Sequence, residues 1–404
     1  MELKKWVRLS DVCDITTGKL DANNAVDGGK YPFFTCAPEP LAIDEFAFDD
    51  DVILLAGNNA NGTFHIQRYH GKFNAYQRTY VLAAKDGYNI DYIYYSLKLS
   101  LVQFQKASQG SQTKFLTKLI LNSFQIRNLP FDIQTKLSSV LRCIDDKISN
   151  NNSINSELES LAKTIYDYWF LQFEFPNEEG LPYKSSGGKM VWSEELKREI
   201  PEGWEVKNIR AVCDIVDCLH SKKPDYSFED ENYYLLQLEN LTSSGYIDLS
   251  EKYFITKEDY LNWTSKIEIQ ENDFVITNAG RTGAVGMIPA GVRCALGRNF
   301  TAIRPTKINP YYLRMFLQSS YMEMQVKSNL DSGAFFKSFN VKSIKEIQVL
   351  IPGQKILERA SDIFSYLVKK IELELSENRE LADLRDWLLP MLMNGQVGFK
   401  EEAT

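Results

Sequence analysis

Two stretches of the chain carry apolar residues at the spacing of an α-helix. From Ile133 to Trp169 apolar side chains recur at intervals of three and four, and the same spacing returns from Ile356 to Met393. This spacing places them along one face of an α-helix. A helix of that length extends about 55 Å at 1.5 Å per residue, and its apolar face needs a partner to cover it. We therefore predict that the two long helices pack against each other, antiparallel, as a rigid spacer.

The segments outside these helices predict mixed α/β structure. Short β-rich runs such as 51–55 and 79–82 are separated by loops rich in glycine and asparagine, of which 57–62 is one. A further helix is predicted over 91–105. The expected fold class is α+β, with two mixed α/β modules separated by two long antiparallel helices.

Long-range repetition divides the chain. The heptapeptide that begins at Asn155 is echoed 223 residues later at Asn378, and residues 9–15 return as 209–215. A period this long indicates a duplicated domain and not an array of short repeats. We expect a first module at 1–130, a first long helix at 131–175, a connector at 176–203, a second module at 204–352, a second long helix at 353–395 and a tail at 396–404.

Charge and composition constrain the class of protein. The chain has 404 residues and a formal net charge of −8, yet the modules are nearly neutral. Residues 1–130 carry 14 Lys and Arg against 13 Asp and Glu, and residues 204–352 carry 17 against 18, so a basic face on either module is compatible with the acidic total. With no run of 18 apolar residues and no apolar leader segment, we expect a cytoplasmic protein with no membrane partner. The six cysteines form no CxxC motif, which indicates free thiols.

Motifs for catalysis are incomplete. The segment from Asn309 to Tyr312 lacks the second proline of an amino-methyltransferase tetrad, and a helix start with proline in its first turn explains it. The glycines of 280–286 have the wrong spacing for a dinucleotide loop, and no lysine in a P-loop context is present. His65 and His70 lack a cysteine or acidic residue at ligand spacing. We therefore expect no catalytic residue, no metal site and no cofactor bound by this chain.

Loops rich in amide and basic side chains lie at equivalent points of the two modules. Arginine can pair with guanine edges, asparagine and glutamine with adenine, and lysine with phosphates. These loops are candidates for DNA contact, and the alternative is that they are solvated surface loops. The candidate residues are Asn58, Asn59, Asn61, Gln77, Arg78, Gln112 and Lys114 in the first module, and Asn278, Arg281, Arg298, Asn299 and Lys337 in the second.

Two further groups belong to the long helices. Trp169, Phe170 and Phe173 form an aromatic cluster at the end of the first helix, which either packs locally against the connector or docks another subunit. Asn155 and Asn378 occupy equivalent positions near the middle of each helix. A polar residue in a helical seam can fix its register, so we expect these two near the axis that relates the helices.

The chain resembles the specificity subunit of type I restriction-modification systems over almost its whole length. The resemblance is carried by the succession of the segments Ile165–Pro176, Gly188–Leu196 and Glu199–Trp204, and is supported by the opening Trp6–Leu9. It implies a non-catalytic, DNA-reading subunit of a methyltransferase and endonuclease complex. Each module would read one half of an interrupted target in double-stranded DNA, and the helices would set the gap.

The resemblance also implies the partners. Two methyltransferase subunits would dock on the helices and modules, and a restriction subunit that translocates DNA would join them. S-adenosylmethionine, ATP and Mg²⁺ would be bound by those partners. Because the target-recognition domains vary within the family, individual base contacts are not carried over.

Two other interpretations are open at this point. A structural adaptor with two protein-binding modules on a coiled-coil spacer would have the same helices, but it would lack salt-sensitive affinity for DNA. A fused methyltransferase or nuclease would be an enzyme, and it would bind S-adenosylmethionine itself.

Overall fold

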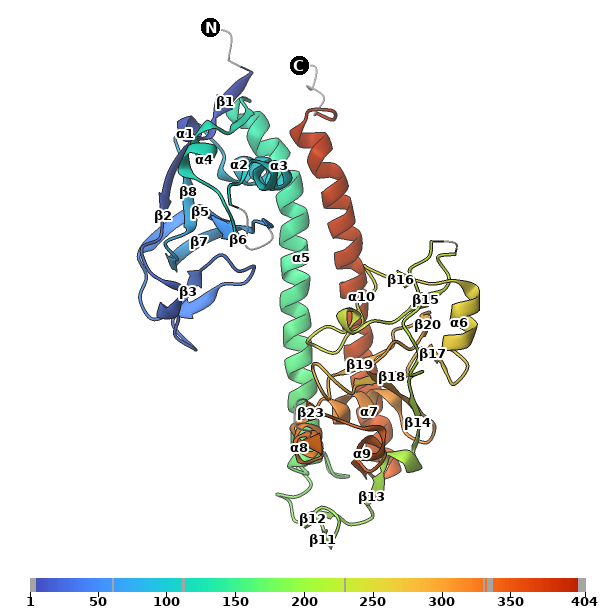
Figure 1. Ribbon diagram of the computed structural model, residues 1–404. Coiled ribbons are helices and arrows are strands. Elements are labelled where there is room, and N and C mark those ends of the chain that lie inside the picture. The colour runs from blue at the N-terminus through green and yellow to red at the C-terminus, as the bar shows by residue number, and fades with distance from the viewer. Residues whose placement is uncertain are drawn as a thin grey trace, which may run out of the picture. The chain divides into compact units, whose positions relative to one another are not determined.

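The computed structural model describes residues 5–59, 62–110, 113–228, 230–329, 331–332 and 337–398. The chain forms two compact units, of which the first comprises Met1–Asn150 with Asn378–Thr404 and the second Asn151–Glu377. Two long helices, α5 (Phe131–Tyr166) and α10 (Gln354–Met393), contribute a segment to each unit (Figure 1). Each predicted apolar stripe is therefore one continuous helix. The first helix ends earlier than expected and continues as a single π-helical turn, Asp167–Leu171.

The first module is built around a six-stranded sheet. Its strand order is β2–β8–β5–β7–β3–β4, with bounds Cys13–Thr17, Thr79–Ala84, Phe48–Ala56, Ile66–Ala75, Tyr31–Phe34 and Leu41–Ile43. Both faces of the central strand β5 are apolar because both are covered. Ile53 and Leu55 point to the core shared with the helices, whereas Val52 and Leu54 point to a smaller core with Phe73.

Short elements complete the first unit. They are the strand pairs β1–β10 (Trp6–Arg8 with Gln125–Arg127) and β6–β9 (Asn58–Asn59 with Lys114–Phe115), and the helices α1 (Leu9–Val12), α2 (Ile90–Leu99), α3 (Leu101–Ala107) and α4 (Lys118–Ser123).

The helix predicted over 91–105 is two helices. The break falls at Ser100, whose backbone leaves the helical region. Each of Ser96 and Ser100 donates its hydroxyl to the carbonyl four residues earlier, at 2.8 Å in both cases. Serine hydroxyls that bond the backbone in this way weaken and bend a helix.

The second module divides its strands between two four-stranded sheets. One has the order β14–β21–β18–β19 (Cys213–Asp217, Phe300–Pro305, Phe274–Thr277, Val285–Met287), and the other β16–β15–β20–β17 (Tyr253–Phe254, Tyr234–Leu235, Arg293–Ala295, Glu268–Gln270). The pairs β13–β24 (Glu205–Asn208 with Gln348–Ile351) and β22–β23 (Asp331–Ser332 with Lys337–Ser338) accompany them. The α-helices are α6 (Lys257–Trp263), α7 (Pro310–Leu317), α8 (Ser320–Ser328) and α9 (Val341–Lys345).

The sequence repeat corresponds to a shared arrangement of strands. The antiparallel order β2–β8–β5–β7 of the first module matches β14–β21–β18–β19 of the second. The following helices are also alike, since Asn89 caps α2 and Asn309 caps α7 with their side chains. In each module a buried tyrosine hydroxyl then bonds the last strand: Tyr92 to the Arg127 carbonyl at 2.9 Å, and Tyr312 to the Leu350 carbonyl at 2.7 Å.

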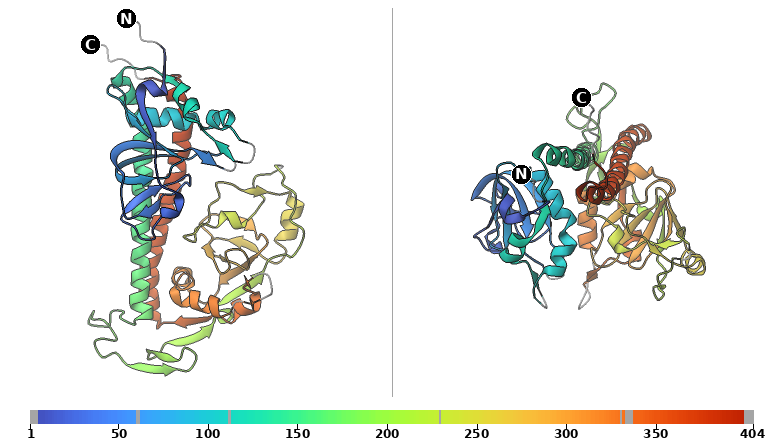
Figure 2. Two further views of the ribbon diagram at one scale, coloured as in Figure 1. Left: turned by 60° about the vertical axis from the view of Figure 1, so that its left-hand side comes forward. Right: turned by 90° about the horizontal axis from the view of Figure 1, so that it is seen from above.

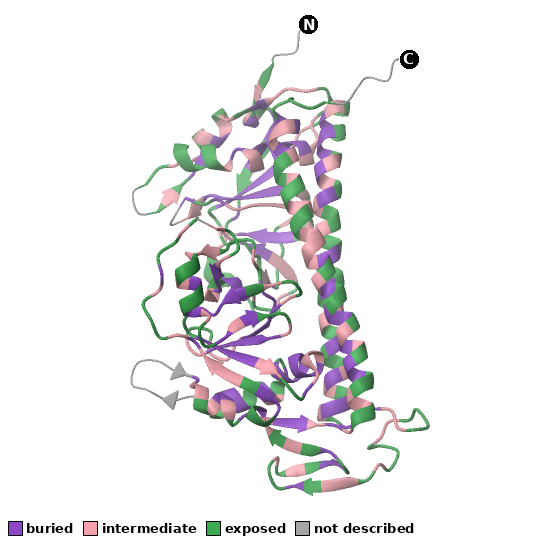
Figure 3. Cartoon of the chain, turned by 90° about the vertical axis from the view of Figure 1, so that its right-hand side faces the viewer, coloured by how far each residue is buried: buried purple, intermediate pink, exposed green. Residues whose placement is uncertain are grey.

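Each unit contains its own contacts between the long helices. In the first unit, Leu137 and Leu141 of α5 share a core with Leu389 and Leu392 of α10. In the second, Ala162 and Tyr166 share a core with Phe364, Leu367 and Val368. Figure 3 shows buried residues recurring along the long helices between exposed ones, as the apolar spacing predicts.

A connector leads from α5 into the second module. It carries a hairpin of β11 (Met190–Ser193) and β12 (Arg198–Pro201), drawn in pale green beyond the end of α5 (Figure 2). All six cysteines are free thiols. The sequence predicts that they are buried, and this holds for Cys13, Cys213, Cys218 and Cys294, whereas Cys36 is partly exposed and Cys143 is exposed. Among the described residues, no helix has the length and apolar character that a membrane crossing needs.

Candidate nucleic-acid interface

The first module brings its candidate loops together through a two-residue strand pair. β6, which follows the end of β5, pairs antiparallel with β9. The backbone N–H of Gly57 donates to the Arg78 carbonyl at 2.8 Å, and the N–H of Leu116 donates to the Gly57 carbonyl at 2.8 Å. A Cβ atom at position 57 would lie 2.3 Å from the Arg78 carbonyl oxygen, so only glycine allows this approach. Three loops that are distant in sequence therefore meet at one place.

These loops surround a hollow of about 340 Å³, which is lined by Thr17, Gly57, Asn58, Gln77, Arg78, Tyr80, Phe115 and Leu116. Within the described residues, the buried Oδ1 of Asn58 has no hydrogen-bond partner. An unpaired buried acceptor lowers stability, so a movement of the Asn58 side chain that let this oxygen accept a hydrogen bond would be favourable. The Tyr80 hydroxyl donates to the Leu116 carbonyl at 2.9 Å, and burial raises its pKa. Tyr80 is thus a fixed wall of the hollow.

Basic and aromatic groups stand at the rim of this hollow. Arg78 and Gln77 are exposed, and no ion pair joins Arg78 to any residue that the structure describes. Arg68 differs, because its guanidinium forms ion pairs with Asp51 at 2.6 Å and Asp91 at 2.8 Å. The free guanidinium of Arg78 is therefore available to an external acceptor, whereas that of Arg68 is already occupied.

Phe115 is a residue of this site that the sequence reasoning missed. Its ring is 41% exposed beside Lys114, although a large apolar side chain gains by burial. An aromatic residue directly after a basic one in a polar loop was the available signal.

The second module arranges its candidates differently. The Asn278 amide nitrogen donates to the Thr301 hydroxyl at 3.0 Å and to the Phe339 carbonyl at 2.9 Å, and the Asn278 backbone N–H donates to the Asn299 carbonyl at 2.7 Å. The Thr301 hydroxyl is also within 3.1 Å of the Asn278 side-chain oxygen. Asn278 therefore joins three segments of the module, and its side chain is occupied by those contacts.

Two arginines of the second module remain on its surface. Arg281 is exposed and also donates to the Leu241 carbonyl. Arg298 is exposed, and the next residue, Asn299, has a positive φ of 65°. The turn is held by Gly297, where a Cβ atom would lie 1.8 Å from the Leu236 carbonyl oxygen. In the matching strand order, Gly57 after β5 corresponds to Asn278 after β18, and both donate their backbone N–H to the turn that precedes the next strand of the order, Gly57 to the Arg78 carbonyl and Asn278 to the Asn299 carbonyl.

Three candidates fall wholly or partly outside the described residues. Asn61 and Gln112 lie in the segments that are not described. Lys337 is placed by its backbone in β23, opposite Ser332, and its side chain is not described.

The aromatic cluster at the end of α5 lies inside the second unit. Trp169 is 9% exposed, and Phe170 and Phe173 are each 1% exposed. The Phe170 ring packs edge-on against Tyr312 at 5.0 Å between centroids, and the guanidinium of Arg198 lies 4.5 Å from the Phe173 ring centroid. The burial of the rings supports the interpretation of local packing, and docking of another subunit by this cluster stays a prediction.

The two mid-helix asparagines belong to different units. Asn155 is 6% exposed, and neither atom of its amide has a hydrogen-bond partner among the described residues. Four residues earlier, the amide of Asn151 donates to the Glu377 carboxylate at 2.7 Å. The expected placement of Asn155 and Asn378 near a common axis stays a prediction.

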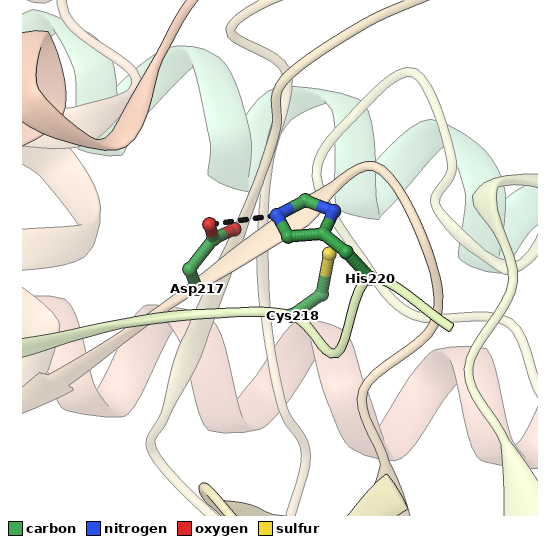
Figure 4. A group of neighbouring side chains, drawn as sticks. All are labelled: Asp217, Cys218 and His220. Atoms are coloured by element: carbon green, nitrogen blue, oxygen red, sulfur yellow. Dashed lines mark hydrogen bonds and ion pairs between the residues drawn. The ribbon is translucent and has the colours of Figure 1, made fainter.

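The structure also assembles three side chains that the sequence reasoning passed over. Asp217, Cys218 and His220 place a carboxylate oxygen, a sulfur and a ring nitrogen within 4.8 Å of one another (Figure 4). They follow directly from the end of β14. The backbone N–H of Cys218 donates to the Phe300 carbonyl at 3.3 Å, which places the group next to the turn that carries Arg298. The spacing of these three residues matches neither a CxxC motif nor a His-rich motif, so these sequence patterns do not identify the group.

Comparisons with known proteins agree with the resemblance drawn from the sequence. The family model described as "Type I restriction modification DNA specificity domain" matches residues 1–160 and 201–382. The type I restriction enzyme EcoDI specificity subunit of Escherichia coli is 27% identical over 390 residues, which cover 90% of this chain and 81% of that protein. The MjaIX specificity subunit of Methanocaldococcus jannaschii is 24% identical, with 78% and 71% covered.

A solved structure shares the fold. The crystal structure of the type I restriction-modification system S subunit from M. genitalium matches with a TM-score of 0.59 at 15% identity, and the match covers 97% of this chain and 98% of that chain. The resemblance predicted from the segments around Trp169 and Trp204 is therefore confirmed at the level of the family.

Proposed function

Because the chain belongs to the type I restriction-modification DNA specificity family, we propose that it is the DNA-reading specificity subunit of such a system and contributes no catalytic group. The observation that carries the proposal is the convergence in the first module of amide and basic side chains from three loops around one hollow. Amide groups and guanidinium forks are the side chains that read base edges, and base contacts give sequence specificity.

Each module reads one half of an interrupted target. The modules share their strand order, and the turns that carry Arg78 and Arg298 directly precede the matching strands β8 and β21. Their surrounding hydrogen bonds differ, since Asn58 keeps an unpaired acceptor and Asn278 does not. Equivalent turns with different free donors and acceptors suit two different half-sites.

The long helices form an antiparallel spacer that sets the gap between the half-sites. Support comes from the order of contacts within the second unit. Asn151 of α5 bonds Glu377 of α10 at 2.7 Å. Tyr166, farther along α5, packs against Phe364, which is earlier in α10, at 6.4 Å between ring centroids. The modules then correspond to residues 1–130 and 204–352, with the connector at 176–203.

The partners are methyltransferase subunits, two per chain, and a restriction subunit, with S-adenosylmethionine, ATP and Mg²⁺ bound by them. Large apolar side chains are exposed on the long helices, where a partner would cover them. They are Leu161 at 47%, Tyr366 at 70%, Leu373 at 68% and Trp387 at 57% exposed. The complex works in the cytoplasm, where the DNA is.

The test is the methylated motif of cells that express the chain with its methyltransferase. Arg78→Ala should relax the half-site read by the first module, and Arg298→Ala or Arg281→Ala the other half-site, because a lost base contact costs about 1–3 kcal/mol of discrimination. Lys114→Ala, if it removes a phosphate contact, should weaken binding without changing the motif. Arg210→Ala is the matched control, since this exposed arginine pairs with Glu346. A substitution in the first module that changed both half-sites in an assembled complex would contradict independent reading.

The spacer has its own test. Removing matched helical turns from α5 and α10 should change the gap and leave both half-sites intact. If the purified chain and its methyltransferase complex lacked any salt-dependent affinity for DNA, the adaptor interpretation would replace this proposal.

A further inference from the structure

We propose that the second module binds a transition-metal ion, with Zn²⁺ the best match, through Asp217, Cys218 and His220. The three donors come from four consecutive positions at the end of β14, so a single short segment supplies them. This inference goes beyond DNA reading, and its primary test needs no DNA.

The donor atoms already lie close together. His220 Nε2 is 2.9 Å from Asp217 Oδ2, and the three donor atoms fall within 4.8 Å of one another. In Figure 4 the imidazole ring lies close to the Cys218 sulfur. Zinc takes sulfur at about 2.3 Å and nitrogen or oxygen at about 2.0–2.2 Å in tetrahedral geometry, which puts the donors about 3.3–3.6 Å apart. Binding therefore requires the Cys218 sulfur and the other two donors to approach by up to about 1 Å, and the Asp217 and His220 donors to separate by about 0.5 Å. The His220 side chain, 71% exposed, is free to make such movements.

The thiol is positioned by its backbone. Cys218 is 2% exposed, its N–H donates to the Phe300 carbonyl, and its carbonyl accepts from Lys266 Nζ at 3.0 Å. A ligand held on both sides in this way loses little freedom when a metal binds. Cys218 belongs to the apolar core of the second module, whereas the Asp217 and His220 side chains are 32% and 71% exposed.

The donor set selects the ion. Thiolate and imidazole favour zinc and other borderline metals, whereas magnesium and calcium need several oxygen donors. Three protein ligands leave a fourth tetrahedral position for water. The ordinary alternative is a simple hydrogen bond between Asp217 and His220 with an uninvolved cysteine next to it.

The first module offers a natural comparison for that alternative. His70 Nδ1 lies 3.6 Å from Asp51 Oδ1, which also makes an Asp–His pair. It includes no cysteine, and Asp51 already pairs with Arg68. If an Asp–His pair sufficed for binding, both sites would take up metal. The proposal requires that only the site with Cys218 does so.

A metal bound at this site would constrain the chain segment that follows β14. Among the described residues between β14 and β15, none belongs to a helix or strand, and the group stands at the start of that stretch. The bond from Cys218 to Phe300 connects it to the strand that follows Arg298 and Asn299. A bound metal would therefore fix the start of a long irregular segment beside the Arg298 turn.

The experiment is a Co²⁺ titration of the purified full-length chain after treatment with a chelator. One equivalent should give the near-ultraviolet absorption of a cobalt–thiolate bond, and one equivalent of Zn²⁺ should abolish it. His220→Ala, a change at an exposed side chain, should weaken Co²⁺ binding at least tenfold, and Cys218→Ser should remove the thiolate absorption. Cys143→Ser, at an exposed cysteine, and His70→Ala should leave both unchanged.

The outcomes are decisive in either direction. No thiolate absorption at one equivalent, or absorption that persists in Cys218→Ser, overturns the proposal. Weak binding that is equal in all variants means an adventitious ion only, and it overturns the proposal too. Cys218 is buried, so Cys218→Ser could fail to fold. In that case His220→Ala is the deciding variant, provided that its circular dichroism spectrum matches that of the unchanged chain. If the metal-free chain still recognised both half-sites, the proposed DNA function would stand without the metal. The metal-site proposal and the DNA-reading proposal can therefore be refuted independently.

Discussion

The two modules share a frame, but they are joined to the long helices by different chemistry. In the first unit the junction adds a polar network to the shared apolar core: Asp145 of α5 accepts a hydrogen bond from the Tyr95 hydroxyl at 2.7 Å and pairs with Arg385 of α10 at 2.9 Å. In the second unit it is aromatic, where Tyr166 and Phe170 pack against Tyr312 of α7.

This difference shows what the repeat preserves. The capped helices α2 and α7 and their buried tyrosines are equivalent, so the frame is common to both modules. The means of attachment is not, because a hydrogen-bonded network and a set of packed rings can fill the same position. The strength of a polar junction depends on the geometry of its hydrogen bonds and on the ionic strength. The strength of an aromatic junction depends on how well the rings fill the available volume. The two attachments should therefore respond to different perturbations.

The largest effect is expected at the aromatic junction. Phe170→Ala should lower the free energy of unfolding of the second unit by about 3–5 kcal/mol, because it leaves a cavity among rings. The measurement is urea denaturation followed by the fluorescence of Trp204, whose ring centroid lies 5.8 Å from that of Phe170. A loss below about 1 kcal/mol would show that these rings do not hold the junction together.

Tyr168→Ala is the control for that experiment and also a test of docking. Tyr168 is 40% exposed on the same turn, so its loss should barely change stability. If the triple alanine variant of Trp169, Phe170 and Phe173 loses the methyltransferase in co-purification while Tyr168→Ala retains it, the loss follows from disrupted packing. Loss in Tyr168→Ala alone would locate a docking contact at this turn.

A smaller effect is expected at the polar junction. Asp145→Ala should destabilise the first unit by about 1–3 kcal/mol, because it leaves the Tyr95 hydroxyl without its acceptor and the Arg385 guanidinium with Asp386 as its remaining partner. Hydrogen exchange of α2 amides reports this unit separately. The matched control is Asp146→Ala, which removes a 58%-exposed carboxylate paired with Arg142 and should cost at most about 0.5 kcal/mol. Equal effects of the two substitutions would refute the network.

The buried asparagines of α5 should respond with opposite signs. Asn151→Leu should destabilise the second unit by about 1–3 kcal/mol, since it removes the hydrogen bond that the Asn151 amide donates to the Glu377 carboxylate. Asn155→Leu should stabilise it by up to about 1 kcal/mol, because neither amide atom of Asn155 has a partner. Urea midpoints measure both. A more stable Asn155→Leu chain whose methylated motif had a different gap would support the role in helix register predicted from the sequence.

The smallest effect is expected in the pH dependence of stability. The hydrogen bond from Arg68 lowers the pKa of Asp51 below its usual value of 3.8. Since the folded-state pKa is the lower one, this carboxylate stabilises the first unit above about pH 4, and the stabilisation is lost as the pH falls through the folded-state pKa. In Asp51→Asn, the free energy of unfolding should fall less steeply as the pH is lowered below about 4. The difference should be less than about 1 kcal/mol, because the Asp51 side chain is 44% exposed. Asp49→Asn, at an exposed position on the same strand, should leave this pH dependence unchanged.

Local patterns determined a large part of this structure. The spacing from Ile133 and from Ile356 predicted two long helices, because an apolar face repeats with the helical turn whatever surrounds it. The run 51–55 predicted a strand, and the repeat predicted two related modules. The segments around Trp169 and Trp204 identified the family, and the family model confirmed it.

Which polar groups remain free was decided by the tertiary structure alone. Asn58 and Asn278 look alike in sequence, yet the partners of Asn278 are Thr301 and Phe339, which lie far along the chain. The burial of the rings at the end of α5 is likewise a property of the fold. Periodicity is a property of neighbouring residues and can be read from the chain. The occupancy of a hydrogen bond, the burial of a ring and the convergence of Cys218 with its neighbours near Phe300 depend on atoms that only folding brings together.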